Sequence, residues 1–364
     1  MQILCVDVGT GTQDILLYDS DRVLENCVQL ILPSPTQIVA RRIRRASANG
    51  RSVLLRGRIM GGGPCAWAAE DHLKQGYSVL ATPDAARTFD DELEKVERMG
   101  VRVVSEDEAA RLDEVERITM RDFDLPAIRA ALAPFDVDLD LAAIAVAVFD
   151  HGNAPPGVSD RVFRFEYIAE TVARNDLAAF AYRREDVPER LTRMQAVAAD
   201  APPDVPTLAM DTGPAAVLGA LEDPVVQKAQ HALVANLGNF HTLAFHLADG
   251  RVLGIFEHHT GELTRAELER YLRQLADGTI SNAEVFADMG HGALVVGRVD
   301  QPLDLLAITG PRRGLLDDSS LAPYLAVPHG AMMVAGCFGL LRALAKRMPD
   351  LSPAIESRLG PASV

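Results

Sequence analysis

A carboxylate followed by a turn of glycines and threonines stands near the start of the chain. Asp7 belongs to the apolar run of residues 3–8, and the turn after it consists of Gly9, Thr10, Gly11 and Thr12. Glycine lacks a Cβ, so successive backbone N–H groups and the threonine hydroxyls of such a turn can surround a polyphosphate. A carboxylate at the end of a strand can hold Mg²⁺ through water or orient an attacking group. A plain hairpin whose glycines adopt positive φ is the alternative.

A second unit of strand, glycine turn and strand occupies residues 231–247. Its turn offers Gly238, Asn239 and Thr242 as phosphate contacts. A hairpin at residues 249–250 and a further strand follow, so the second half of the chain repeats the pattern of the first. This repetition predicts two lobes of related architecture around one cleft.

Histidines accumulate in the second half of the chain, beside acidic residues. They are His241, His246, His258, His259 and His291, with Glu257 and Asp288 nearby. The segments EHHT and DMGHG can bring one of the adjacent histidines close to Asp288 and His291, a set that suits a divalent metal or a general acid–base pair. Adjacent histidines point to opposite faces of a strand. We expect His259 and His291 to act in a substrate site, with or without a metal, and Asp288 to take part in metal binding.

Two loops carry further candidates. VFDHGNAPPG (148–157) follows a strand that is apolar on both faces, at the edge where α/β sheets gather ligands. Asp150 is a candidate base for activating a substrate hydroxyl or water, and a turn capped by Asp and Asn side chains is the alternative. In RIMGGGPCAW (58–67), three glycines stand between a strand and the N-terminus of a helix. Such a loop can bind an anion, and a close crossover from strand to helix is the alternative.

Alternating strand and helix patterns predict an α/β protein. The expected strands are 3–8, 14–19, 27–33, 52–60, 77–82, 101–105, 141–149, 207–211, 231–237, 241–247, 251–259 and 303–309. The expected helices are 35–50, 65–76, 86–100, 212–221, 264–276 and 331–347, together with a helical segment over 170–206.

Composition narrows the class of protein. A chain of 364 residues with 48% hydrophobic and 24% charged residues can fill two sizeable cores. Its formal net charge of −15 gives it no electrostatic reason to bind nucleic acid or anionic lipid. The arginine-rich stretch 40–51 has no interleaved aromatic residues, so we interpret it as the solvated face of a short helix.

The compartment is expected to be the cytoplasm. The chain begins directly with a strand pattern and not with a signal peptide, and its apolar runs are too short or too interrupted to span a bilayer. The four cysteines are scattered, without the short spacing of a zinc or iron–sulfur ligand set. The last dozen residues are expected to form a frayed tail.

The motifs together resemble the superfamily of actin, sugar-kinase and heat-shock-chaperone ATPases. VDVGTGTQDILLYD and VANLGNFHTLAFHL resemble its two phosphate hairpins, LLAITGPRRGLL its adenosine turn, and MDTGPAAVLGAL and PHGAMMVAGCFGLL its two connecting helices. The resemblance implies two duplicated ribonuclease H-like lobes around an interlobe cleft, in residues 1–222 and 223–364, with the helix 331–347 returning towards the hinge. It implies ATP and Mg²⁺ as cofactors, and nucleoside contacts by Gly310, Pro311 and Arg312.

More narrowly, the chain resembles a bacterial and archaeal family labelled pyruvate formate-lyase activating enzymes. FEHHTGEL, DMGHGA and TGPRRG carry this likeness. True activases hold an iron–sulfur cluster on a tight motif of three cysteines, which this sequence lacks, so the cysteines do not support the chemistry of the label.

Three functional hypotheses follow from the resemblance. The first is an ATP-dependent phosphotransferase or ATPase acting on an unidentified small-molecule acceptor. The second is a non-catalytic nucleotide sensor or assembly protein, because Asn236 stands where the superfamily usually has an acid and a neutral oxygen binds metal less strongly. The third is a metal-dependent hydrolase centred on the histidines. Assembly as a homodimer is left open beside the monomer.

Overall fold

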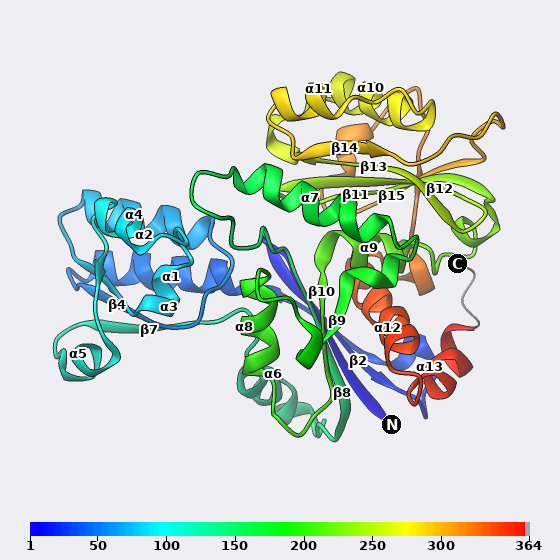
Figure 1. The fold of residues 1–364 in the computed structure, drawn as a ribbon. Coiled ribbons are helices and arrows are strands. Elements are labelled where there is room, and N and C mark those ends of the chain that lie inside the picture. Colours follow the sequence, from blue (N-terminus) through cyan, green and yellow to red (C-terminus); the bar gives the residue numbers. More distant parts are fainter. Residues whose placement is uncertain (361–364) are drawn as a thin grey trace.

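The first of three β-sheets is built around the start of the chain (Figure 1). The computed structural model describes residues 1–360. The first sheet has the strand order β3-β2-β1-β8-β10-β9, in which β1-β2-β3 is an antiparallel meander and β8 and β10 run parallel to β1. Its strands are β1 (Gln2–Val8), β2 (Thr12–Asp19), β3 (Val28–Pro33), β8 (Leu141–Val148), β9 (Ala181–Arg183) and β10 (Thr207–Asp211).

The second sheet repeats this order in the other half of the chain. Its order is β14-β13-β12-β11-β15-β16, with an antiparallel meander β11-β12-β13 and with β15 and β16 parallel to β11. Its strands are β11 (His231–Leu237), β12 (His241–Ala248), β13 (Arg251–His259), β14 (Gly292–Val295), β15 (Leu305–Thr309) and β16 (Tyr324–Leu325). The core β3-β2-β1-β8-β10 thus matches β13-β12-β11-β15-β16, so the fold is a duplicated α/β fold of two lobes, as predicted.

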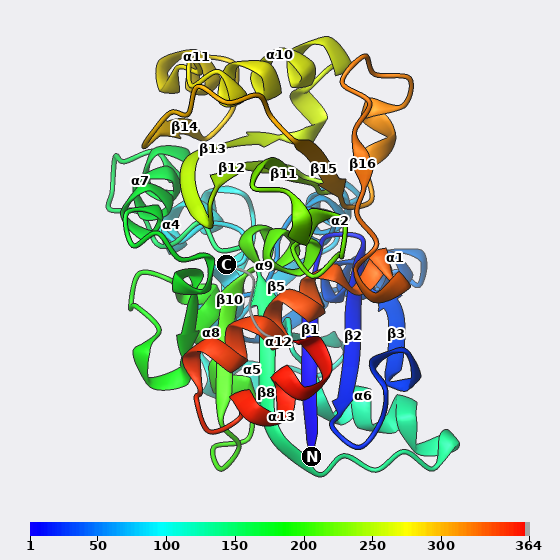
Figure 2. The same cartoon turned by 90° about the vertical axis from the view of Figure 1, so that its right-hand side faces the viewer.

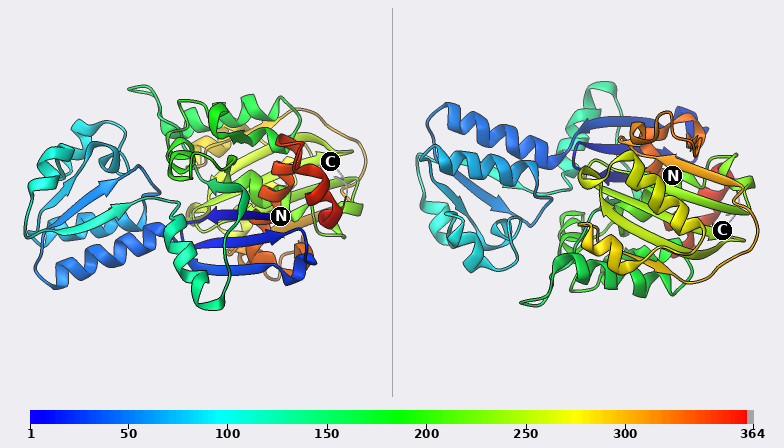
Figure 3. Two further views of the ribbon diagram at one scale, coloured as in Figure 1. Left: turned by 90° about the horizontal axis from the view of Figure 1, so that it is seen from below. Right: turned by 90° about the horizontal axis from the view of Figure 1, so that it is seen from above.

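A third sheet belongs to an insertion between β3 and β8. Its order β6-β5-β4-β7 is all parallel, and it has its own apolar core (Val39, Ile43, Val53, Leu55, Val79 and Ile118 among others). The strands are β4 (Val53–Gly57), β5 (Val79–Ala81), β6 (Arg102–Val103) and β7 (Glu116–Met120). Figure 3 shows this insertion to one side of the two lobes.

The helices lie on the faces of the sheets and between them. They are α1 (Pro35–Ala48), α2 (Pro64–Lys74), α3 (Pro83–Ala86), α4 (Leu93–Arg98), α5 (Glu106–Arg111), α6 (Leu125–Leu132), α7 (Asp160–Val172), α8 (Thr192–Asp200), α9 (Thr212–Ala220), α10 (Arg265–Ala276), α11 (Asn282–Ala287), α12 (Ala335–Arg347) and α13 (Ser352–Leu359). α10 packs its apolar face on the outside of the second sheet, and α9 and α12 lie between the first and second sheets (Figure 2).

Small residues let α9 and α12 cross in close contact. A Cβ on Gly219 would lie 1.7 Å from the carbonyl oxygen of Ala335, and a Cβ on Gly339 would lie 1.9 Å from that of Ala215. No side chain fits at either position, so the two backbones touch where the lobes meet. This geometry matches the connecting helices expected from the small residues of both segments.

The element predictions fail where local pattern is weak. The expected helical segment 170–206 is wrong: the helix α7 begins earlier, at Asp160, and ends at Val172, and 3₁₀ turns and β9 lie between it and α8. The helix expected from residue 331 starts at Ala335, after two short 3₁₀ turns. Part of the expected frayed tail, residues 361–364, lies outside the described residues; the described part before it is the helix α13. No helix within residues 1–360 is long and apolar enough to cross a membrane.

The helix crossing makes a stability prediction. Gly219→Ala and Gly339→Ala should each destabilise the protein by about 1–3 kcal/mol or more, because the new methyl group must displace a backbone carbonyl. Gly261→Ala is the matched control: no atom lies within 4 Å of its Cβ position, and a change within about 0.5 kcal/mol is expected. Urea unfolding measures all three, and wild-type stability of both hinge variants would contradict the close crossing.

Candidate functional site

A cleft of about 1240 Å³ lies where the two lobes and the insertion meet. Both hairpin turns line it, through Gly9 and Thr10 of the first and Gly238 and Asn239 of the second. The insertion contributes the glycine loop 61–63 and the acidic loop 90–92, and the loop 149–160 closes another side. Sequence elements that are far apart in the chain therefore converge on one cavity.

The two hairpin turns have the same internal geometry. The N–H of Gly9 donates to the carbonyl oxygen of Thr12, and the N–H of Gly238 donates to that of His241, both at 2.9 Å. Within residues 1–360, the N–H groups at positions 10, 11, 239 and 240 have no hydrogen-bond partner. Each turn therefore presents two consecutive free donors, as an anion site requires.

The tips of the two turns touch. A Cβ on Gly11 would lie 2.7 Å from Nδ2 of Asn239, so the amide of one turn rests against the glycine of the other. Thr242, the last predicted contact of the second turn, is buried and shares a hydrogen bond with the hydroxyl of Thr260. Thr12 lies at the start of β2 and faces away from the cleft, beside a separate hollow described below.

Asp7 lies beneath the first turn, at the N-terminal ends of the helices α9 and α12. Its Oδ1 accepts a hydrogen bond of 2.6 Å from the hydroxyl of Thr212, and a Cβ on Gly336 would lie 2.0 Å from its Oδ2. Burial raises the pKa of Asp7 to about 6, and burial together with the charge of Asp7 raises the pKa of Asp14, its partner across the hairpin, to about 7. The pair is thus partly protonated near neutral pH.

The predicted adenosine turn lies next to the second hairpin. A Cβ on Gly310 would lie 2.5 Å from the carbonyl oxygen of Leu237, and the N–H of Arg312 donates to the same carbonyl oxygen. Pro311 lies between them. Gly310, whose φ is +97°, is therefore packed against the end of β11, and none of these three residues lines the cleft.

Asp150 lines the cleft but is fully engaged by the backbone. Its Oδ1 accepts from the N–H of Gly152 at 2.9 Å, and its Oδ2 accepts from the N–H of Met194 at 2.8 Å. Burial raises the pKa of Asp150, whereas these two bonds lower it. The geometry matches the alternative in which Asp150 caps a loop.

Asp288, the second predicted metal ligand beside Asp7, does not line the cleft. It accepts a hydrogen bond of 2.7 Å from Tyr271 and lies 3.6 Å from Nε2 of His258. His258 is buried on the opposite face of β13 from His259, as the alternation of a strand requires. The structure thus separates His258 and Asp288 from the cleft and leaves His259 on it.

Three histidines from distant segments meet at the inner wall of the cleft. One ring nitrogen of each of His151, His241 and His291 lies within 4.8 Å of the others. The ring of His259 lies beside this trio, with its centroid 4.7 Å from that of His291. Nδ1 of His259 forms a hydrogen bond with the carbonyl oxygen of Met289. Burial, together with the charges of Arg164 and the neighbouring histidines, lowers the pKa of His241 well below the usual value and that of His291 to about 2, so both rings are neutral at pH 7.

A buried arginine supports this wall. Arg164 of α7 is completely buried and forms paired hydrogen bonds with both Asp211 and Glu257. Its guanidinium lies 3.7 Å from the ring centroid of Phe149, which in turn stacks on His241 at 3.7 Å. Arg164 therefore connects the first lobe, through Asp211, with the second lobe, through Glu257.

Sequence reasoning missed several of these residues. Asp211 is the last residue of a buried strand, close to the kind of position that marked Asp150 as a candidate, so the sequence did contain a signal for it. Arg164 lies on the helix that was not predicted, and nothing local marks it. The cleft's acidic edge was missed as well: burial and the charges of Asp160, Asp150 and Asp90 raise the pKa of Asp91 to about 6.

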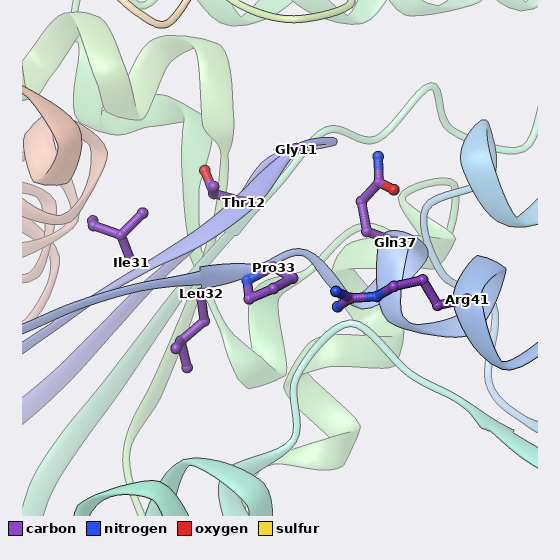
Figure 4. Close-up of a pocket in the computed structure, with 7 residues that line it drawn as sticks. All are labelled: Gly11, Thr12, Ile31, Leu32, Pro33, Gln37 and Arg41. Carbon is purple, nitrogen blue, oxygen red and sulfur yellow. The ribbon is translucent and has the colours of Figure 1, made fainter.

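A separate hollow of about 400 Å³ lies on the outer side of the first hairpin (Figure 4). Thr12 and residues 31–33 form one side, and Gln37 and Arg41 of α1 extend beside it. Gly11 lies at its edge, so only the tip of the turn separates this hollow from the contact with Asn239.

The fold and the cleft define a two-lobed protein with duplicated ribonuclease H-like sheets. The chain belongs to the family described as "Putative pyruvate format-lyase activating enzyme (DUF1786)", whose model matches residues 60–315, more than two thirds of the chain. A search of curated proteins finds no match.

Solved structures with similarity to the chain include three of bacterial proteins. The ROK hexokinase from Thermus thermophilus is 13% identical, with coverage of 96% of this chain and 100% of that chain and a TM-score of 0.32. The inorganic polyphosphate/ATP-glucomannokinase from Arthrobacter sp. strain KM is 11% identical, with coverage of 95% and 99% and a TM-score of 0.37. The ethanolamine utilization protein EutJ from Carboxydothermus hydrogenoformans is 13% identical, with coverage of 94% and 89% and a TM-score of 0.31. The fold assignment itself rests on the duplicated sheet order.

The pair of aspartates on the first hairpin predicts a pH-dependent stability. The pKa of Asp14 in the folded state is raised to about 7. Between about pH 4 and 7 the folded state therefore keeps a proton that the unfolded chain has already released. The unfolding free energy should therefore fall as pH rises through this window, by up to about 1.4 kcal/mol per pH unit for each proton. Asp14→Asn, a neutral mimic, should be more stable than wild type at pH 7.5 and similar at pH 4. Parallel pH profiles in urea unfolding would contradict this assignment.

The buried arginine makes a second stability prediction. Arg164→Met should cost about 3–5 kcal/mol, because Asp211 and Glu257 are left buried without a counter-charge. Acidification should reduce this loss, since burial raises the pKa of Asp211 and its carboxylate then becomes neutral. Arg270→Met is the matched control: its pair with Glu284 is exposed, and a cost below about 1 kcal/mol is expected. Equal losses in the two variants would contradict the role of Arg164.

Proposed function

We propose that the cleft binds a nucleoside triphosphate with Mg²⁺ and transfers its terminal phosphoryl group to a small-molecule acceptor or to water. The observation that carries this proposal is the pair of facing turns, each with two consecutive free N–H donors. Such donors are fixed in position before the ligand arrives, so they stabilise phosphate charge without reorganisation. A polyphosphate chain would run between the turns, in the space that the Asn239 amide now fills.

The carboxylates near the turns fit Mg²⁺ by their chemistry. Mg²⁺ prefers oxygen ligands and keeps several waters, so it needs only one or two carboxylates. Asp91 lines the cleft, and Asp7 lies beneath the first turn, directly behind the cleft wall; the raised pKa of each would drop when a cation binds. The ion would neutralise phosphate charge in a cleft whose own edge is acidic.

The acceptor would lie between the insertion and the second hairpin. Trp67 of α2 and Phe240 of the second turn contact each other with ring centroids 5.7 Å apart and line the cleft. Beside them, Arg193 holds the buried carboxylate of Asp122 and donates to the carbonyl oxygen of Phe149. An apolar wall with a few polar groups is typical of a small-molecule site.

Insertion of a charge between the turns tests the proposal. Asn239→Asp keeps the side-chain size but places a negative charge beside the phosphates, so the affinity for Mg²⁺-ATP should fall at least about tenfold. Asn26→Asp makes the same change at an exposed site outside the cleft and should keep wild-type affinity. Calorimetric titration measures the three proteins. Equal affinity of both variants, or no heat from wild type at millimolar nucleotide, would contradict the proposal.

A nucleotide sensor without turnover is the second candidate. Two observations favour it: Asn236 supplies only a neutral oxygen to the cleft, and both oxygens of Asp150 are occupied by backbone N–H groups. Binding without phosphate release, and without transfer to any of a panel of metabolites, would select the sensor. Phosphate release or transfer would select the enzyme.

The family description suggests a different chemistry, activation of pyruvate formate-lyase. The four cysteines are all buried and free, and the sulfur of Cys337 lies 3.6 Å from the carbonyl oxygen of Cys5. Burial raises the pKa of both thiols well above the usual value, which disfavours the thiolate that a cluster needs. These cysteines do not support cluster-based chemistry.

A further inference from the structure

Three imidazole rings with free nitrogens face one point at the inner wall of the cleft. We propose that His151, His241 and His291 bind a divalent transition-metal ion of the zinc class, with an open coordination position towards the cleft. The trio of rings differs from the histidine set expected from sequence, which paired His259 and His291 with Asp288. The site is separate from the carboxylates assigned to Mg²⁺.

Unpartnered nitrogens are the first argument for the metal. His291 is 1% exposed, yet neither of its ring nitrogens has a hydrogen-bond partner within residues 1–360, and Nε2 of His241 is buried without a partner as well. A buried polar nitrogen without a partner is costly, about 1–3 kcal/mol. A metal ion bound by both rings would take one unpartnered nitrogen of each ring and so reduce this cost.

The spacing is the second argument. Zn²⁺ bonds to imidazole are about 2.0–2.1 Å, which places two ligand nitrogens of a tetrahedral site about 3.4 Å apart. The three nitrogens already lie within 4.8 Å of one another, so rotation of the side chains closes the remaining gap. Three histidines with one open position is the arrangement of catalytic zinc sites.

The surroundings of the rings are the third argument. Nδ1 of His291 lies 3.5 Å from a carboxylate oxygen of Glu257, in the position of a carboxylate that orients a metal-binding histidine. The ring of His241 is fixed by its stack on Phe149, with an interplanar angle of 8°. His151 is exposed, at the mouth of the trio, so the fourth position opens to the cleft.

The chemistry of the three imidazole ligands indicates which ions the site would bind. Three neutral imidazoles suit Zn²⁺, Co²⁺, Ni²⁺ or Cu²⁺, whereas Mg²⁺ prefers oxygen. His241 ends the second hairpin turn, so an ion here would lie next to the proposed phosphate donors, where it can polarise an oxygen of the acceptor. The metal assignment does not depend on nucleotide binding, because the ligands are all side chains of this chain.

Titration of the chelator-treated full-length protein with Co²⁺, without nucleotide, tests the assignment. One equivalent should bind and give the intense visible absorption of a four-coordinate ion, Zn²⁺ should displace it, and excess Mg²⁺ should not. His151→Gln and His291→Gln should each weaken Co²⁺ binding at least about 100-fold, since even the loss of an orienting partner costs 10–100-fold.

His246→Gln is the matched control. His246 lies on the same strand as His241, but it pairs with His231 at 2.6 Å between Nε2 atoms and lies away from the cleft. This variant should bind Co²⁺ like wild type. His151 is exposed, so His151→Gln should fold like wild type, and circular dichroism checks the fold of every variant. No Co²⁺ binding by wild type, undiminished binding by folded His151→Gln, or equal loss in His246→Gln would overturn the proposal.

Discussion

The double ion pair of Arg164 is the interaction on which the cleft depends. Its guanidinium is completely buried and joins Asp211, at the end of a strand of the first lobe, to Glu257, on a strand of the second. A buried charge without partners would cost far more than the pairs contribute, so both carboxylates must remain in place for the lobes to pack as they do. The glycine crossing of α9 and α12 also holds the lobes together. Together they fix the distance between the lobes.

This fixed distance explains the rest of the site. The two hairpin turns come into contact through Gly11 and Asn239. Each turn lies at the end of a central strand, β1 or β11, and both strands run towards the same interface. The stack of Arg164, Phe149 and His241 carries the same restraint to the histidines. One arrangement therefore combines a place for anions, a set of neutral nitrogens and an apolar wall within a single cavity. Such a combination is suited to small-molecule chemistry on a charged ligand.

Parts of this arrangement could be predicted from sequence because their signals are local. Glycines between two apolar runs indicate a turn, and small residues on a helix indicate a close crossing, so the sequence predicts both hairpins and the helix α9 with nearly correct bounds, and the helix α12 with a start before Ala335. The Arg164 pairs join residues 47 and 93 positions apart, and the histidine trio draws on three separate segments, two loops and the start of β12. No pattern in a single segment reports such contacts. The burial of Asp7 and the backbone bonds of Asp150 also depend on tertiary packing.

The most direct test of the account is a crystal structure of the protein with Mg²⁺ and a nonhydrolysable ATP analogue. The phosphate chain should lie between the turns 9–12 and 238–242, within hydrogen-bond distance of their free N–H groups. The Asn239 side chain should be displaced from its position against Gly11. Analogue density elsewhere on the molecule, or crystals that remain free of nucleotide while the turns stay in contact, would contradict it.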